Sequence, residues 1–169
     1  MTPLARRLPI AALLVCLAAP LHADTEAQRH TLAGLKSLHL EFAVRGDDTQ
    51  SFGLDEASLR PETEARLTAA GITLVDAEGS RHVPGVPWLF LDISTMKADD
   101  SKGYAWLLRL RLQQRACLER DPQVCESVAT WEHERFGSVG RRKVKTLRED
   151  IADVVNQFVG AYLAANPAR

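Results

Sequence analysis

The sequence lacks any apolar run long enough to cross a bilayer. The longest one extends from Leu8 to Ala19, whereas a membrane-spanning helix needs about 20 apolar residues. We therefore expect no transmembrane span.

The common catalytic and cofactor-binding motifs are also missing. The chain contains no glycine-rich phosphate loop, no G-x-S-x-G, no Cys-x-x-Cys and no H-E-x-x-H, the patterns that mark phosphate binding, serine hydrolysis, redox chemistry and zinc proteases. The nearest metal-like pair is His133 and Glu134, but neighbours on a strand point to opposite faces. The sequence therefore predicts no catalytic residue, no metal ligand and no cofactor.

Neither sign of charge is in excess. Lys and Arg number 21 against 22 Asp and Glu, so the net charge is −1. A nucleic-acid-binding domain is as a rule strongly basic. We expect no nucleic-acid partner.

What the chain does have begins with an export signal. Arg6 and Arg7 precede the apolar run, and Ala23 offers a cleavage point, which together predict a secretory signal peptide over 1–23 and a periplasmic location. Cys16 follows Val15, where lipid-modified cysteines need a small residue, so lipoprotein anchoring is disfavoured. The remaining residues, 24–169, fit one domain.

Hydrophobic periodicity predicts an α+β fold. Residues alternate between apolar and polar over 37–45, 88–96, 104–120 and 125–136, which indicates strands, and a further strand is expected over 72–77. Helices are expected over 54–71, with the regular part beginning near Ser58 so that Pro61 falls in the first turn, and over 141–166. This order, β-α-β-β-β-β-α, predicts a mixed, mainly antiparallel sheet of about five strands, with the first two parallel and both helices on one face.

Cys117 and Cys125 flank a predicted turn over 121–123. If that turn is centred on Asp121, the two cysteines face each other across the hairpin, within reach of a disulfide. An exported compartment is usually oxidising, which favours the bond over free thiols. The register stays open, because the same pairing sets Leu110 opposite Glu132 and a bulge would shift it.

Two surfaces are candidates for binding a partner. In the last helix Val159 and Leu163 widen the apolar stripe beyond what one sheet face usually needs, which suggests an exposed patch for a protein partner. A basic run at the start of this helix suggests contact with anionic phospholipid or lipopolysaccharide head groups, or else a solvated helix end held by nearby acids. The run consists of Arg141, Arg142, Lys143 and Lys145.

A catalytic alternative depends on few residues. Asp47, Asp48 and His82 would have to converge between the loops at 46–53 and 77–87 to form a small periplasmic hydrolase or ligand-binding site. Asp92 interrupts an apolar strand; it is either a catalytic carboxylate or, more simply, faces solvent or pairs with an arginine of the next strand, Arg109 or Arg111. Any of the three tryptophans, which lie on predicted strands, packs the core or serves as a ligand platform.

Three segments carry a resemblance to a known group. The strand-helix-strand start with "RLTAAGITLVDA", the long hairpin through "ATW" and the final helix "LREDIADVVNQFVGAYL" resemble the layout of small periplasmic domains of bacterial outer-membrane accessory proteins. The resemblance implies a non-catalytic role in envelope assembly or transport through protein-protein contacts. It implies no site residues.

Overall fold

The computed structural model describes residues 25–97 and 103–167. The predicted signal peptide and Cys16 lie outside these residues. A five-stranded sheet forms one layer, in the order β2-β1-β3-β4-β5. The strands are β1 (Ser37–Gly46), β2 (Thr73–Leu74), β3 (Trp88–Lys97), β4 (Gly103–Leu118) and β5 (Asp121–Gly140).

The sheet is mixed, as predicted. β1 pairs in parallel with β2 and with β3, while β3-β4 and β4-β5 are antiparallel. β2 is reduced to two residues, fewer than the sequence suggested. The helical elements are α1 (Glu26–His30), η1 (Gln50–Phe52), α2 (Glu56–Ala69), α3 (Ala77–Ser80), η2 (Arg141–Thr146) and α4 (Leu147–Ala165).

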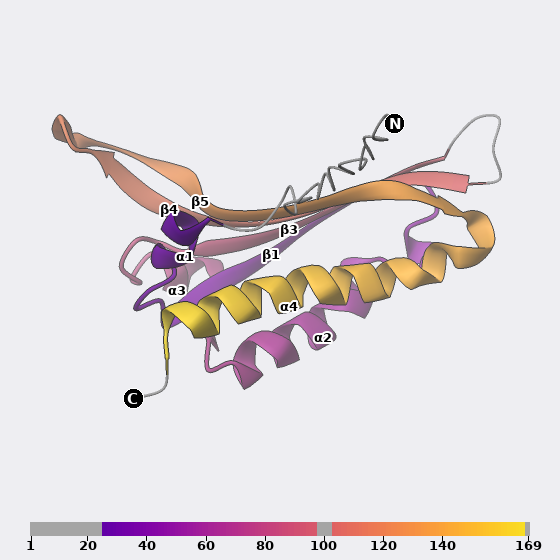
Figure 1. Cartoon of the computed structure of the whole chain (residues 1–169), viewed down its shortest axis with the longest axis horizontal. Helices are drawn as coiled ribbons and strands as arrows, with labels where there is room; N and C mark the ends of the chain where they lie inside the picture. Colours follow the sequence, from indigo (N-terminus) through magenta and orange to yellow (C-terminus); the bar gives the residue numbers. More distant parts are fainter. Residues whose placement is uncertain (1–24, 98–102, 168–169) are drawn as a thin grey trace, which may run out of the picture.

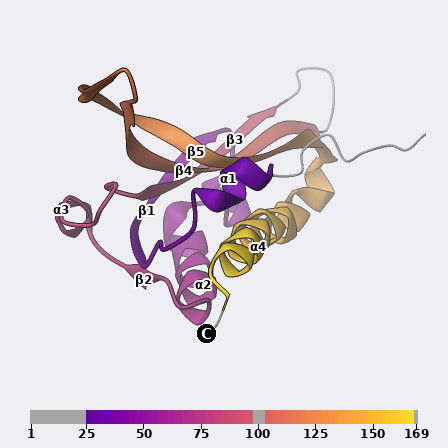
Figure 2. The same ribbon diagram turned by 60° about the vertical axis from the view of Figure 1, so that its left-hand side comes forward.

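The two long helices lie on one face of the sheet. Figures 1 and 2 show α2 and α4 side by side beneath it, and the guanidinium of Arg66 on α2 donates to the side-chain carbonyl of Asn156 on α4 at 3.1 Å. β5 is tied to α4 by Arg135, whose guanidinium lies 2.8 Å from the carboxylate of Asp150. This arrangement confirms the predicted α+β fold.

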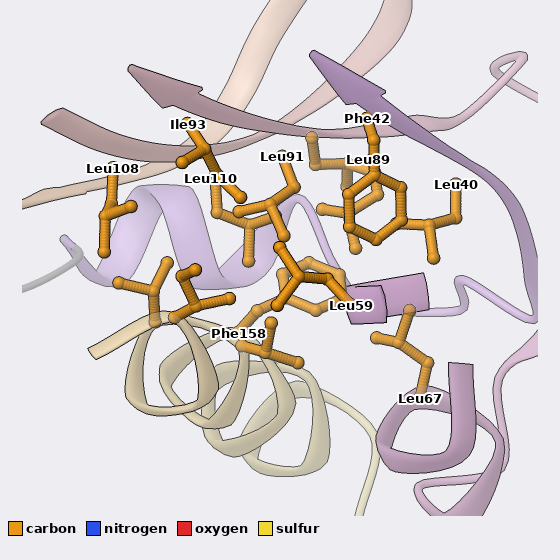
Figure 3. Packing of buried hydrophobic residues seen from close by; sticks show 14 of the residues in the cluster. Leu40, Phe42, Leu59, Leu67, Leu89, Leu91, Ile93, Leu108, Leu110 and Phe158 are labelled. Carbon is orange, nitrogen blue, oxygen red and sulfur yellow. The ribbon is translucent and has the colours of Figure 1, made fainter. Parts of the chain in front are cut away.

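The core lies between the sheet and the two helices. Figure 3 shows strand residues such as Leu91 and Leu110 facing Leu59 and Leu67 of α2 and Phe158 of α4. All five are at most 2 % exposed. The alternation along the strands sends one set of side chains into this layer and the other set to the opposite face, here called the outer face.

α2 begins two residues earlier than expected. The Asp55 carboxylate caps it by accepting from the N–H of Ser58 at 3.1 Å and from its hydroxyl at 2.9 Å, and this hydrogen bonding holds the pKa of Asp55 below its usual value. Pro61 therefore lies in the second turn, not the first. Because Pro61 lies near the amino-terminal start of α2, it removes only one backbone hydrogen bond of the helix. The hydrogen bonds of the Asp55 cap help to offset that loss.

The amino-terminal segment is part of the fold and covers α4. Leu32 and Leu35 are buried. The side chain of Asn166 links the two segments, because its amide donates to the Leu32 carbonyl at 2.9 Å and its oxygen accepts from the Gly34 N–H at 2.7 Å. The segment is therefore fixed to the carboxyl-terminal end of α4.

The basic run forms a 3-10 helix and not the start of an α-helix. η2 spans Arg141–Thr146 and α4 begins at Leu147. Glu149 and Asp150 therefore occupy the first turn of α4, where negative charge is favourable. The expected α-helical start at 141 was wrong by six residues, and Val144, which is fully buried, fixes the 3-10 turn to the core.

Candidate functional site

The β4-β5 hairpin extends beyond the rest of the sheet. β3 stops pairing with β4 at Gln113, so from Gln114 onward β5 is the one described strand that pairs with β4. The Arg115 N–H still donates to the carbonyl of Gly85, in the loop before β3, at 2.7 Å. This segment, 114–128, is called the arm, and Figure 1 shows it projecting from the body. The turn lies at Glu119 and Arg120, two residues before the predicted position, and β5 continues to Gly140, past the expected end at 136.

The arm carries the predicted disulfide. Cys117 and Cys125 are opposite each other in the β4-β5 register and are joined by a disulfide bond. A bulge at Thr130 shifts the register farther along, so that Leu110 faces His133 instead of Glu132. The sequence had left that shift open.

Replacing both arm cysteines with serine is expected to lower the free energy of unfolding by up to about 2.5 kcal/mol. The figure is the chain-entropy value for a loop of about nine residues. Chemical denaturation of the Cys117→Ser, Cys125→Ser double variant measures it, and hydrogen exchange shows whether the arm opens first. An unchanged unfolding midpoint together with unchanged exchange in 114–128 would contradict the stabilising role of the bond.

The residues of the catalytic alternative do not converge. β1 and β3 run parallel from His39 opposite Trp88 to Gly46 opposite Thr95, a length of about 23 Å. The loop with Asp47 and Asp48 follows one end of this pair, and the loop with His82 precedes the other. A shared site for the three side chains is therefore excluded by the strand length.

Asp47 and Asp48 have structural partners. The Asp47 carboxylate accepts from the backbone N–H of Lys97 at 3.2 Å, and the Asp48 carboxylate accepts from the Tyr104 hydroxyl at 2.5 Å. This last hydrogen bond raises the pKa of Tyr104 above its usual value, because it favours the protonated phenol. The two carboxylates tie the β1 loop to the ends of β3 and β4.

Asp92 pairs with an arginine of the neighbouring strand, as the simpler of its two interpretations predicted. Its carboxylate accepts from Arg111 at 2.6 Å and lies 3.9 Å from Arg45. Arg109, which is opposite it in the register, pairs instead with Glu134 of β5. These ion pairs run across the outer face of the sheet.

The tryptophans divide between core and surface. Trp131 is 1 % exposed and packs edge-on against Phe158, with ring centroids 5.1 Å apart. Trp88 lies on the outer face, where its indole N–H donates to the Ser80 hydroxyl at 2.8 Å and its ring stacks on Phe90. These rings form part of the lining of an open pocket of ≈ 380 Å³ that also includes Arg81, Arg115 and Glu126. Trp106 is half-buried and packs against the core, so Trp88 is the better placed of the two partly exposed tryptophans to serve as a ligand platform.

The predicted protein-binding patch on α4 is small. Leu163 is 49 % exposed, but Val159 is half-buried and packs against the core. A contact through these two residues stays a prediction.

The basic run borders a second pocket. Its volume is ≈ 780 Å³, and it lies where the ends of β3 and β5 meet η2. The four basic side chains of the run are exposed. The pocket is lined by Lys97, Gly103, Tyr104, Gly140, Arg141, Arg142 and Lys143.

Within the two described ranges, no helix is long and apolar enough to span a membrane. The same residues contain no group of three or more His, Cys, Asp or Glu side chains placed to hold a metal ion.

Sequence reasoning missed three exposed apolar side chains on the arm and two at the far end of the sheet. Leu118, Val124 and Val128 are 38 %, 45 % and 39 % exposed. Met96 and Phe136 are 66 % and 71 % exposed. That Leu118, Val124 and Val128 lie outside the main body of the sheet becomes clear only because β4 and β5 are longer than β3.

Comparison with known proteins yields no family. No family model matches the chain, and no curated protein matches it. Among solved structures, the PelC dodecamer from Paraburkholderia phytofirmans is 9% identical, covers 79% of this chain and 89% of its own, and has a TM-score of 0.38. A leucine-to-methionine variant of that protein is 10% identical, covers 79% and 91%, and has a TM-score of 0.36. Scores this low assign neither fold nor function.

Proposed function

We propose that this protein is an exported, non-catalytic accessory protein of the cell envelope that binds a protein partner through its arm. The observation that carries the proposal is the arm itself, a projecting two-stranded ribbon with exposed apolar side chains and a disulfide near its tip.

The composition of the arm suits recognition better than folding. A two-stranded hairpin with no third strand is only marginally stable in water, and Leu118, Val124 and Val128 contribute little to the core because they remain exposed. The disulfide holds this segment in one conformation before binding. Such preorganisation reduces the entropy lost when a partner binds.

The edge of the sheet offers a second element of recognition. β5 is the last strand in the sheet order, so backbone groups along its free side can pair with an added strand. Near Thr130 that side is occupied, since the Thr31 hydroxyl donates to the Thr130 carbonyl at 3.2 Å. From this point to the tip, no described strand pairs with this side of β5.

Export into an oxidising compartment is supported by two features. The sequence of 1–23 has the pattern of a signal peptide, and the disulfide is typical of proteins outside the cytosol. Fractionation of the native host, followed by mass spectrometry of the amino terminus and of the cysteines, tests both. Recovery in the cytosol with residue 1 and two free thiols would contradict export.

Changing the arm's apolar residues is expected to abolish capture of the partner. The triple variant Leu118→Ser, Val124→Ser, Val128→Ser removes the exposed apolar area and keeps the disulfide, and buried apolar anchors supply most of the affinity in protein interfaces. Envelope proteins crosslinked to the unmodified chain are compared with those crosslinked to the variant. We expect at least a tenfold loss of the specific product.

Leu163→Ser serves as the matched comparison, because it removes one exposed leucine from the other candidate surface. If the triple arm variant still crosslinks to the partner and Leu163→Ser does not, the partner binds α4 and the proposal for the arm is wrong.

A further inference from the structure

We infer that the end of the sheet opposite the arm docks on a bilayer that contains anionic phospholipid. This surface is called the basic end, and it is defined by Met96, Lys97, Phe136, Arg141, Arg142, Lys143 and Lys145. The inference does not depend on the arm or its partner.

Positive charge is concentrated at this end. All five cations are exposed, and within the described residues none of them lies within ion-pair distance of a carboxylate. Among the described residues, the acidic groups nearby are Asp47 and Asp48, which accept hydrogen bonds from the Lys97 N–H and the Tyr104 hydroxyl, and Glu149 and Asp150 at the start of α4, of which Asp150 pairs with Arg135. The five cations outnumber these described carboxylates, and clustered Lys and Arg side chains are attracted to an anionic membrane surface.

The geometry suits a phosphate head group. Four of the five cations, all except Lys145, line the ≈ 780 Å³ pocket between β3 and η2. Lys97 lines it from β3 and Arg141 to Lys143 line it from η2. A head group in this hollow would meet guanidinium and ammonium groups from two directions, and hydrogen bonds from such charged donors to phosphate are stronger than those between neutral groups.

Exposed apolar side chains accompany the charge. Met96 directly precedes Lys97 at the end of β3. Phe136 lies four residues before Gly140, the last residue of β5, so about 13 Å of strand separates the two. They are 66 % and 71 % exposed and are the two most exposed large apolar residues of the described chain.

Sheet register brings these two side chains to one region of the outer face. Met96 pairs with Ala105, and Leu107 pairs with Phe136, two residues farther along β4. Single exposed hydrophobics are ordinary on a protein surface. At this same end of the sheet, the apolar pair and the five cations, which have no ion-pair partner among the described residues, provide two signals, apolar insertion and electrostatic attraction, that stable binding at an interface requires.

The test uses protein purified after export, so that the predicted signal peptide does not itself bind lipid. Sedimentation with vesicles of phosphatidylcholine and phosphatidylglycerol is compared with sedimentation on pure phosphatidylcholine. We expect binding to the anionic vesicles only. Changing the four basic residues of η2 to Gln should weaken it on the order of 100-fold or more.

A matched control removes the same charge elsewhere. Lys36, Arg81, Arg115 and Arg120 are exposed and lie away from the basic end, and their change to Gln should alter binding by no more than a few-fold. The arm triple variant should bind vesicles as the unmodified protein does. Equal losses in the two charge variants would show a net-charge effect and overturn the inference.

Insertion is tested by Phe136→Trp. Its fluorescence should shift to the blue on anionic vesicles and be quenched by brominated acyl chains, while Leu163→Trp, at the other end of α4, should show neither change. Phe136→Ser should weaken vesicle binding about tenfold. If Phe136→Trp is unquenched, or if soluble polyanions bind as tightly as vesicles, the site recognises a soluble anion and the membrane inference is wrong.

Discussion

Replacing Gly46 with alanine is expected to lower the free energy of unfolding by about 4 kcal/mol. Gly46 ends β1 with φ +115°, a backbone conformation that side chains with a Cβ rarely adopt. A Cβ at this position would also overlap the backbone carbonyl of Thr95, the residue opposite it in β3. Strain and overlap each cost about 1–3 kcal/mol, and neither is relieved by moving a flexible side chain.

The overlap has consequences beyond its own strand pair. Thr95 is buried, and its hydroxyl donates to the Asp47 carbonyl at 3.1 Å. Relief of the clash would separate the ends of β1 and β3 and weaken this bond. The loop that brings Asp48 to Tyr104 depends on the same junction.

Gly34→Ala is the matched control. Gly34 also has a positive φ, +76°, but a Cβ there would meet nothing within 4 Å. It should cost only about 1–2 kcal/mol, the ordinary penalty of the left-handed conformation. Denaturant midpoints of the two variants separate strain from overlap, and equal losses would show that the close approach of β1 to β3 at Gly46 is not as described.

The sheet could be predicted because alternation is a local property. Leu38, Leu40, Leu89, Leu91 and Leu110 are read directly from the printed chain as apolar positions with a period of two, and all are buried. α1 was missed although its signal is present. Thr25 and Gln28 form a capping box, the T-x-x-Q pattern that marks a helix start.

The arm and the basic end could not be predicted, because both depend on pairing between distant strands. β4 has 16 residues and β3 has 10, and the surplus becomes a projection only once the register is known. Phe136 and Met96 are separated by 40 positions in the chain, and only the two antiparallel ladders place them on one face. The sequence alone shows that η2 is basic, but it does not show that Met96 and Phe136 lie at the same end of the sheet.

The outer face combines two kinds of surface. Its middle is neutralised by cross-strand ion pairs, including Arg109 with Glu134 and Arg111 with Asp92. Such pairs contribute little to stability at a partly exposed site, but each places a carboxylate against a guanidinium in the middle of the sheet. The exposed apolar side chains lie at the two ends of the sheet, Leu118, Val124 and Val128 on the arm and Met96 and Phe136 at the basic end, where the two contacts are proposed.

Replacing Phe158 with alanine is expected to lower the free energy of unfolding by about 4 kcal/mol, the middle of the usual range for truncating a buried phenylalanine. Phe158 is fully buried on α4 and meets Trp131 of β5 edge-on at 5.1 Å. It therefore fills the space between the last helix and the edge strand, and alanine would leave a cavity that neither element can close without moving. Denaturant unfolding measures the loss, and near-ultraviolet circular dichroism reports on Trp131.

Two further variants make the Phe158 result decisive. Phe158→Leu keeps most of the volume and should cost about 1.5 kcal/mol, so that a measurable folded state remains if alanine prevents folding. Leu163→Ala removes a side chain on the same helix that is 49 % exposed, and it should change stability by no more than about 0.5 kcal/mol. Since α4 packs on the sheet through one stripe only, a loss at Leu163 as large as at Phe158 would mean that the helix is rotated from the orientation described.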